Sequence, residues 1–260
     1  MKLFDSHCHL NDPVFEKDRH EILERMTADG VQAAMIAGVS LATSQKALVL
    51  AEAHSGIYAA LGVHPHDASG CDEAVLSTLA ALARKPKVRA WGEIGLDFNR
   101  MYSPQDTQEK WFLRQLETAD ALNLPVIFHE RDSRGRLLEL LQTRPNSKRT
   151  GVIHCFSGTT AELERYLEMG FYIGVTGIVT LRKRGRRLRE QVGLIPPDRI
   201  LIETDAPYLT PAPQKNRHRR NEPAFVKSVL FRLAEVLSVE PESLAADIWD
   251  NTCTLFGVRP

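Results

Sequence analysis

The hydrophobic positions of this chain form two alternating patterns. Short runs rich in apolar and β-branched residues, typical of buried strands, recur from the first residues to just beyond position 200. Between them, apolar residues follow helical spacing, as in Phe112, Leu116 and Ala119 or in Val226, Val229, Leu230, Leu233 and Leu237. The pattern predicts eight strands, at residues 3–7, 31–39, 57–63, 88–96, 125–129, 151–156, 171–176 and 199–204.

Strands that alternate with helices predict a parallel sheet, because parallel neighbours need a crossover connection of about a dozen residues or more. Eight such units in 260 residues average about 32 residues each, enough for a strand, a helix and two loops. This favours an α/β fold, the (β/α)8 TIM barrel. The main competitor is a doubly wound open sheet, but no G-x-G-x-x-G follows the first predicted strand. Without a linker or repeat, one domain over residues 1–260 is expected.

Composition and charge narrow the class of protein. Hydrophobic residues make up 43% and charged residues 25%, as in ordinary folded proteins, and 33 basic residues balance 33 acidic ones. A neutral chain has no overall attraction to nucleic acid or membranes, so any basic site must be local. No membrane-spanning run is present, and residues 1–10 are too polar for a signal peptide, so we expect a cytoplasmic protein with four reduced cysteines.

Metal-ligating residues gather at the ends of the predicted strands, where TIM barrels carry their active sites. His7 and His9 are two positions apart, so on a strand both face the same way. Without a cation, the buried acids Glu93, Glu203 and Asp205 would raise each other's pKa, because like charges repel. A bound metal ion would remove that repulsion. More ligands are present than one tetrahedral ion uses, so we expect two divalent ions, about 3.5–4 Å apart. The full set is His7, His9, His64, His66, Glu93, His129, His154, Glu203 and Asp205.

Two basic runs follow the last two predicted strands. Residues 182–189 hold six basic residues, and residues 215–220 hold four. TIM barrels commonly bind phosphate with these loops, and arginine donates paired hydrogen bonds to phosphate oxygens. The runs therefore favour contact with phosphate or nucleic acid over a solvated helix face. Tyr102, Phe156 and Tyr208 lie near the same rim and are candidates for stacking on bases, although packing is the commoner role of such aromatics.

Seven segments, taken together and in order, resemble the TatD family of metal-dependent deoxyribonucleases. They are Ser6-His7-Cys8-His9-Leu10, Gly62-Val63-His64-Pro65-His66, Gly92-Glu93-Ile94-Gly95-Leu96-Asp97, His129 with Arg131 and Asp132, Ile153-His154-Cys155-Phe156-Ser157-Gly158, Glu203-Thr204-Asp205-Ala206-Pro207-Tyr208 and Arg220-Asn221-Glu222-Pro223. The resemblance runs from Phe4 to Phe256. It implies a TIM-barrel hydrolase that removes nucleotides from DNA with two divalent ions.

The resemblance also implies roles for individual residues. His7, His9, Glu93 and Asp205 would hold the first ion, and Glu93, His129 and His154 the second, so that Glu93 bridges the two. Asp205 would accept the proton of the attacking water, Glu203 would orient a water or a ligand, and His64 would contact the phosphate or the leaving group. Substrate phosphates would be held by Arg131, Arg182, Arg184, Arg217, Arg220 and Asn221.

The resulting hypothesis is a nuclease dependent on magnesium, manganese or zinc, acting as a 3′–5′ exonuclease on single strands, with DNA preferred to RNA. A hydrolase of a small amide, lactone or phosphoester is the alternative, because the same metal ligands can open those bonds. A nucleic-acid-binding protein with structural metals is a third reading, disfavoured because histidines and acids open into the barrel mouth. A monomer is compatible with the sequence, which does not specify the oligomeric state.

Overall fold

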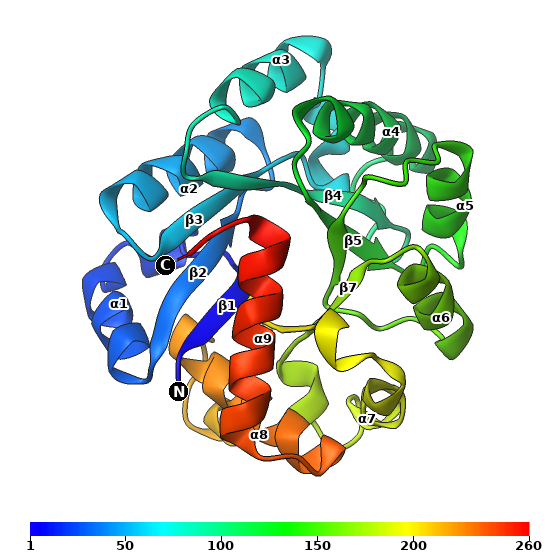
Figure 1. Cartoon of the computed structure of the whole chain (residues 1–260). Coiled ribbons are helices and arrows are strands. Elements are labelled where there is room, and N and C mark those ends of the chain that lie inside the picture. Colours follow the sequence, from blue (N-terminus) through cyan, green and yellow to red (C-terminus); the bar gives the residue numbers. More distant parts are fainter. Residues whose placement is uncertain (260) are drawn as a thin grey trace.

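The structure, a computed structural model, describes residues 1–259. Eight strands form one sheet in sequence order, and each strand pairs in parallel with the next (Figure 1). The predicted (β/α)8 barrel is confirmed. The strands are β1 (Leu3–Cys8), β2 (Val31–Ala37), β3 (Ile57–Leu61), β4 (Val88–Asp97), β5 (Val126–Arg131), β6 (Gly151–His154), β7 (Tyr172–Val175) and β8 (Ile200–Ile202).

Helices surround the barrel, and most of them connect one strand to the next (Figure 1). In the part of the chain described, no helix is long and apolar enough to cross a membrane. The helices are α1 (Arg19–Ala28), α2 (Leu41–Ala53), α3 (Glu73–Leu82), α4 (Gln105–Leu122), α5 (Arg136–Thr143), α6 (Thr160–Glu168), α7 (Arg186–Gln191), α8 (Val226–Leu237) and α9 (Pro241–Phe256).

Hydrophobic side chains form two layers. The larger cluster packs the helices on the outside of the strands and includes the predicted helical positions Phe112, Leu116 and Ala119. The smaller cluster takes alternate strand residues, such as Ile127 and Val152, and joins them to the end of α9. Because alternate residues of a strand share a face, this cluster fills the interior of the barrel. Helix α9, red in Figure 1, lies across that end, so polar chemistry is confined to the other end.

The seam between the first and last strands closes beside the predicted site. The backbone N–H of Asp205 donates to His7 O at 2.9 Å, and that of His9 donates to Ala206 O at 2.7 Å. The Ser6 hydroxyl also donates to Ile202 O at 3.0 Å. Barrel closure therefore fixes three of the predicted ligands next to one another.

Several predicted boundaries are displaced. The last strand ends at Ile202 rather than at residue 204, because Thr204 bonds to the Asp5 carboxylate instead of continuing the sheet. The basic run at residues 182–189 is only partly a loop, since α7 begins at Arg186. Pro223 opens a short 3-10 turn, and α8 follows it from Val226.

Candidate metal centre

Six predicted ligands meet at the carboxyl ends of the strands. Their positions follow from the strand pattern, because His129 lies two residues after the interior residue Ile127, and His154 two after Val152. Asp205 follows β8 with a φ of 57°, a left-handed conformation that turns the chain off the strand. The open cavity above the barrel has a volume of about 670 Å³, and its lining includes His9, His64, Glu93, His129, His154 and Asp205.

Four donor atoms form a first group. His7 Nε2 lies 3.3 Å from His9 Nε2, 3.3 Å from Glu93 Oε2 and 3.8 Å from Asp205 Oδ1. His9 Nε2 lies 3.3 Å from Asp205 Oδ1 and 3.9 Å from Glu93 Oε2. Ligand atoms roughly 2.0–2.1 Å from a tetrahedral ion are roughly 3.3–3.4 Å apart, so these atoms are spaced as one ion requires.

The other oxygen of Glu93 belongs to a second group. Glu93 Oε1 lies 2.6 Å from His129 Nδ1 and 3.8 Å from His154 Nε2. His64 Nε2 is 3.5 Å from the same oxygen. The two oxygens of Glu93 therefore face different sets of histidines, and His154 Nε2 lies between the two groups, since it is also 3.8 Å from Asp205 Oδ1.

An oxygen near the far nitrogen distinguishes three of the candidate ligand rings, whereas the far nitrogen of His7, Nδ1, is buried without a hydrogen-bond partner among the described residues. His9 Nδ1 lies 3.3 Å from Ala37 O, and His129 Nε2 lies 3.4 Å from Asp97 Oδ2. His154 Nδ1 lies 2.9 Å from Glu203 Oε1, although the N–H is not aligned for a standard hydrogen bond. An oxygen at the far nitrogen keeps the proton there and leaves the near nitrogen free to bind a metal. These three rings are thus poised as ligands.

His64 has the opposite arrangement. Its Nδ1 accepts the backbone N–H of His66 at 3.0 Å, so in the neutral ring Nε2 carries the proton. Burial and the neighbouring His129 lower the pKa of His64 to about 4, which keeps the ring neutral at pH 7. His64 therefore presents an N–H to the cavity and is unsuited to bind a metal through Nε2.

The remaining charges are strongly coupled. Burial opposes the ionisation of Glu93, but the surrounding histidines outweigh it and hold the pKa of Glu93 well below its ordinary value. Burial likewise opposes the imidazolium of His154, yet Glu203 and Glu93 raise the pKa of His154 to about 10. The carboxylates of Asp97 and Glu93 raise the pKa of His129 to about 9 against the same opposition. The metal-free cluster balances buried carboxylates with protons, and a divalent cation can take their place.

The donor chemistry fits divalent metal ions, with imidazole nitrogens and carboxylate oxygens in overlapping groups that share His7 and Glu93. A family model, described as TatD related DNase, matches residues 4–257 of this chain. The chain belongs to this family.

Relatives of the chain carry consistent names. Among the TatD relatives, the "3′-5′ ssDNA/RNA exonuclease TatD" of Citrobacter koseri is 42% identical over 258 residues, covering 98% of this chain and 99% of that protein. Its counterpart from Escherichia coli K12 is 41% identical over 258 residues, with the same coverage. The crystal structure of the TatD homologue YJJV from Escherichia coli K12 has a TM-score of 0.91 at 31% identity and covers 99% of this chain and 98% of that one. The chain is a hydrolase of the TatD nuclease family.

Two acids lie behind the candidate ligands, beside their imidazoles. Glu203 is fully buried and accepts the Cys155 N–H at 2.6 Å while facing His154, so it lies behind the site, as predicted. Asp97 does the same for His129 and also bonds to His66 Nε2 at 2.7 Å. Sequence reasoning missed the role of Asp97, although this acid closes the strand that carries Glu93.

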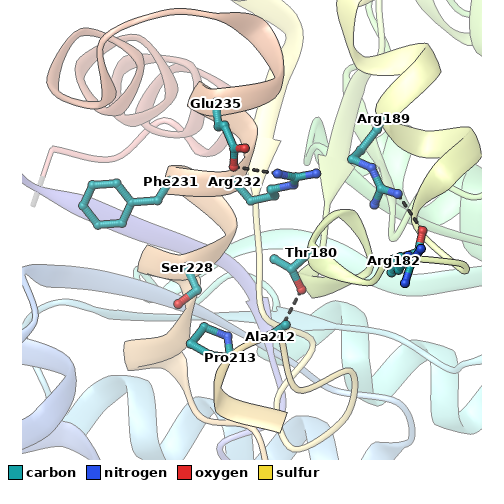
Figure 2. Close-up of a pocket in the computed structure, with 9 residues that line it drawn as sticks. All are labelled: Thr180, Arg182, Arg189, Ala212, Pro213, Ser228, Phe231, Arg232 and Glu235. Carbon is teal, nitrogen blue, oxygen red and sulfur yellow. Dashed lines mark hydrogen bonds and ion pairs between the residues drawn. The ribbon is translucent and has the colours of Figure 1, made fainter. Parts of the chain in front are cut away.

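The predicted substrate contacts are divided by the structure. The open cavity above the barrel, which we call the metal cavity, is lined by Arg131, Arg184, Tyr102 and Tyr208. Arg182 instead lines a separate cavity between the loop after β7 and helix α8 (Figure 2). Arg217 is exposed and lies outside the lining of the metal cavity.

Three predicted substrate contacts are corrected. The Arg220 guanidinium pairs with Asp18, donates to Val14 O at 2.7 Å and stacks 4.7 Å from the Phe15 ring centre, so it is held within the fold. Asn221 is fully buried, and its amide donates to Thr204 O and Tyr208 O, shaping the loop after β8. Phe156 is only 3% exposed and packs against Tyr166, so it is not available to stack on a base.

Proposed function

We propose that this chain is a divalent-metal-dependent exonuclease that removes nucleotides from the 3′ end of single-stranded nucleic acid, with DNA preferred to RNA. One observation carries the proposal: the two oxygens of Glu93 face two groups of histidines, and three of these rings have their far nitrogen on an oxygen. Membership of the TatD family and the names of its relatives support the polarity and the substrate class.

Two ions are proposed, each magnesium, manganese or zinc. His7, His9, Glu93 and Asp205 would hold the first ion, and Glu93, His129 and His154 the second. When bound, such ions lower the pKa of water and neutralise charge on a phosphodiester. Asp97 and Glu203 act as positioning residues, because each keeps the proton of one ligand imidazole on the nitrogen that faces away from the ion.

Two further side chains are placed to handle protons and charge. Asp205 is partly exposed in the cavity, with 15% of its side chain accessible, and would accept the proton of the attacking water. His64 presents Nε2–H beside Glu93, so it would donate a hydrogen bond to a phosphoryl oxygen or to the leaving 3′ oxygen. Since His64 is neutral at pH 7, its contribution is hydrogen bonding rather than charge.

The rim of the cavity suits a single strand. Arg131 and Arg184 bring cationic groups to the lining, and arginine binds phosphate oxygens through two parallel hydrogen bonds. Tyr102 and Tyr208 are 65% and 55% exposed, so their rings are accessible to unstacked bases. Contacts to phosphates and base faces are tolerant of sequence, so weak sequence preference is expected.

Metal-depleted protein incubated with 5′-end-labelled DNA and RNA oligonucleotides of equal sequence tests the proposal. With added Mg²⁺ or Mn²⁺, single-stranded DNA should shorten one nucleotide at a time from the 3′ end, faster than RNA. Glu93→Gln should abolish the ladder. Glu222→Gln is the matched control, because it changes a buried carboxylate that pairs with Arg25 away from the cluster. Cleavage that survives chelator, or full activity in Glu93→Gln, would overturn the proposal.

A further inference from the structure

The first basic run borders a second cavity that shares part of its lining with the metal cavity. This cavity has a volume of about 440 Å³, and the two share Ser157, Ile178 and Arg184 in their lining. Beyond the shared residues, the second cavity is lined by residues of the run itself and by neighbours in α7, including Lys183, Arg186, Arg187 and Gln191. We call this second cavity the exit groove.

The cations of the exit groove are available to a ligand. Within residues 1–259, Lys183, Arg184 and Arg187 have no ion-pair partner within 4 Å and no side-chain hydrogen bond. Arg186 bonds to Glu190 at 2.9 Å, in a pair that is exposed to solvent and therefore weak. The groove thus presents three uncommitted positive charges, of which Arg184 stands at the junction with the metal cavity.

A buried polar atom also lacks a partner here. Gln191 is 3% exposed and lines the exit groove, and its Nε2 donates to Gly158 O at 3.2 Å. Its Oε1 has no hydrogen-bond partner among the described residues. Buried acceptors are normally satisfied, so this atom marks a point in the wall of the exit groove where a donor is missing.

The two other places that could receive the strand are less suitable. The cavity on the other side of the run, shown in Figure 2, has one arginine, Arg182, whose guanidinium has no partner among the described residues. Its other two are used: Arg189 donates to Val179 O, Leu181 O and Arg182 O, and Arg232 pairs with Glu235 at 2.6 Å. The second basic run lies apart from both the metal cavity and the exit groove, since none of its residues lines either.

We infer that the exit groove binds the phosphates of the nucleic-acid strand on the 5′ side of the scissile bond. This inference rests on the proposed function: if the 3′ end enters the metal cavity, the rest of the strand must leave it, and the exit groove shares Arg184 with that cavity. The groove is predominantly cationic, because its one acid, Glu190, pairs with Arg186. The groove holds the strand by its backbone. It sets how long a substrate must be for tight binding, and it leaves the chemical step unchanged.

The experiment compares a dinucleotide with a 12-nucleotide single strand of thymidines in steady-state kinetics with Mg²⁺. In the double variant Lys183→Ser/Arg187→Ser, KM for the 12-mer should rise about tenfold at low salt, while kcat and the dinucleotide KM stay at wild-type values. The dependence of log KM on log salt should weaken by about 1.4, from two lost phosphate contacts at about 0.7 each.

The matched control removes the same charge from the segment before β4, as Arg84→Ser/Lys85→Ser, where both side chains are exposed at the end of the barrel opposite the site, and should leave the 12-mer KM unchanged. An equal rise in this control would assign the effect to overall charge and overturn the inference. A 12-mer KM that is unchanged in the groove variant would overturn it as well. Wild-type hydrolysis of the dinucleotide tests the proposed function separately and also reports that the variant is folded.

Discussion

Glu203 allows a direct single-residue test, because it lies beside the proposed metal ligand His154 and is not itself a proposed ligand. Its carboxylate accepts the Cys155 N–H at 2.6 Å and the Ser6 hydroxyl at 3.3 Å, and it lies 2.9 Å from His154 Nδ1. The Cys155 N–H and His154 Nδ1 both face the same oxygen, Oε1, so in Glu203→Gln the amide oxygen can keep both contacts while the NH₂ group replaces Oε2 beside the Ser6 hydroxyl. The substitution therefore removes the negative charge of the acceptor and leaves the acceptor in place.

The expected cost follows from the lost charge. A hydrogen bond to a charged acceptor contributes about 1.5–3 kcal/mol, against about 0.5–1.5 kcal/mol for a neutral one, and each 1.4 kcal/mol corresponds to about a factor of ten in affinity. We therefore expect the metal affinity of Glu203→Gln to fall about 10- to 100-fold, the range found when residues that orient metal ligands are changed. With Glu203 neutral, the pKa of His154 should also fall from its raised value near 10.

The assay is a titration of metal-depleted protein with Mn²⁺, followed by activity and by calorimetry, together with an NMR pH titration of the His154 ring. Chemical denaturation of the metal-free protein measures any general loss of stability. Glu222→Gln serves again as the control for an isosteric change of a buried carboxylate. Wild-type metal affinity and an unchanged His154 pKa in Glu203→Gln would refute the positioning role.

Three further predictions concern residues around the site. In Gly174→Ala the new Cβ would lie 2.6 Å from Glu203 Oε1, so the carboxylate must move and Mn²⁺ affinity should fall about tenfold; wild-type affinity in the titration would contradict this. In Arg220→Gln, loss of the solvent-screened pair with Asp18 should cost about 0.5–1 kcal/mol of unfolding free energy at pH 7. Because hydrogen bonds from Arg220 lower the pKa of Asp18, this difference should shrink as pH falls through that lowered pKa, to the part that comes from the contacts with Val14 O and Phe15. A difference that does not change with pH would contradict the assignment. Tyr208→Ala should raise KM for single-stranded DNA about tenfold, whereas Tyr208→Phe should keep the wild-type KM; equal values for both variants would exclude base stacking.

The barrel and its ligands could be predicted because both depend on local pattern. Strand periodicity places every second residue inside the barrel, so His129 and His154 continue the row of Ile127 and Val152. The carboxyl ends of eight parallel strands converge on one mouth whatever the loops do. The identities of the strand-end residues were therefore enough to nominate a metal centre.

The substrate contacts were harder to predict, because they depend on which partners the loops supply. The basic run predicts that Arg220 binds phosphate. In the structure its guanidinium pairs with Asp18, about 200 positions earlier in the chain. The motifs predict substrate contacts for Asn221 and Phe156. In the structure the buried Asn221 amide donates to backbone carbonyls, and the buried Phe156 ring packs against Tyr166. No local pattern specifies such long-range pairings.

Asp97 shows a different kind of omission. It is buried and bonds to both His66 and His129, and those histidines lower its pKa against the effect of burial. Its position at the end of β4, four residues after Glu93, is the same signal that drew attention to Glu203. Six expected ligands already account for two ions, so the strand-end pattern assigns no role to Asp97.

The central claim, that Glu93 joins two metal ions, is tested most directly by anomalous diffraction from crystals of the Mn²⁺-loaded protein. The account predicts two anomalous peaks about 3.5–4 Å apart, one beside each oxygen of Glu93, with His7 and His9 at one and His129 and His154 at the other. A single peak, or peaks that do not share the Glu93 carboxylate, would contradict it.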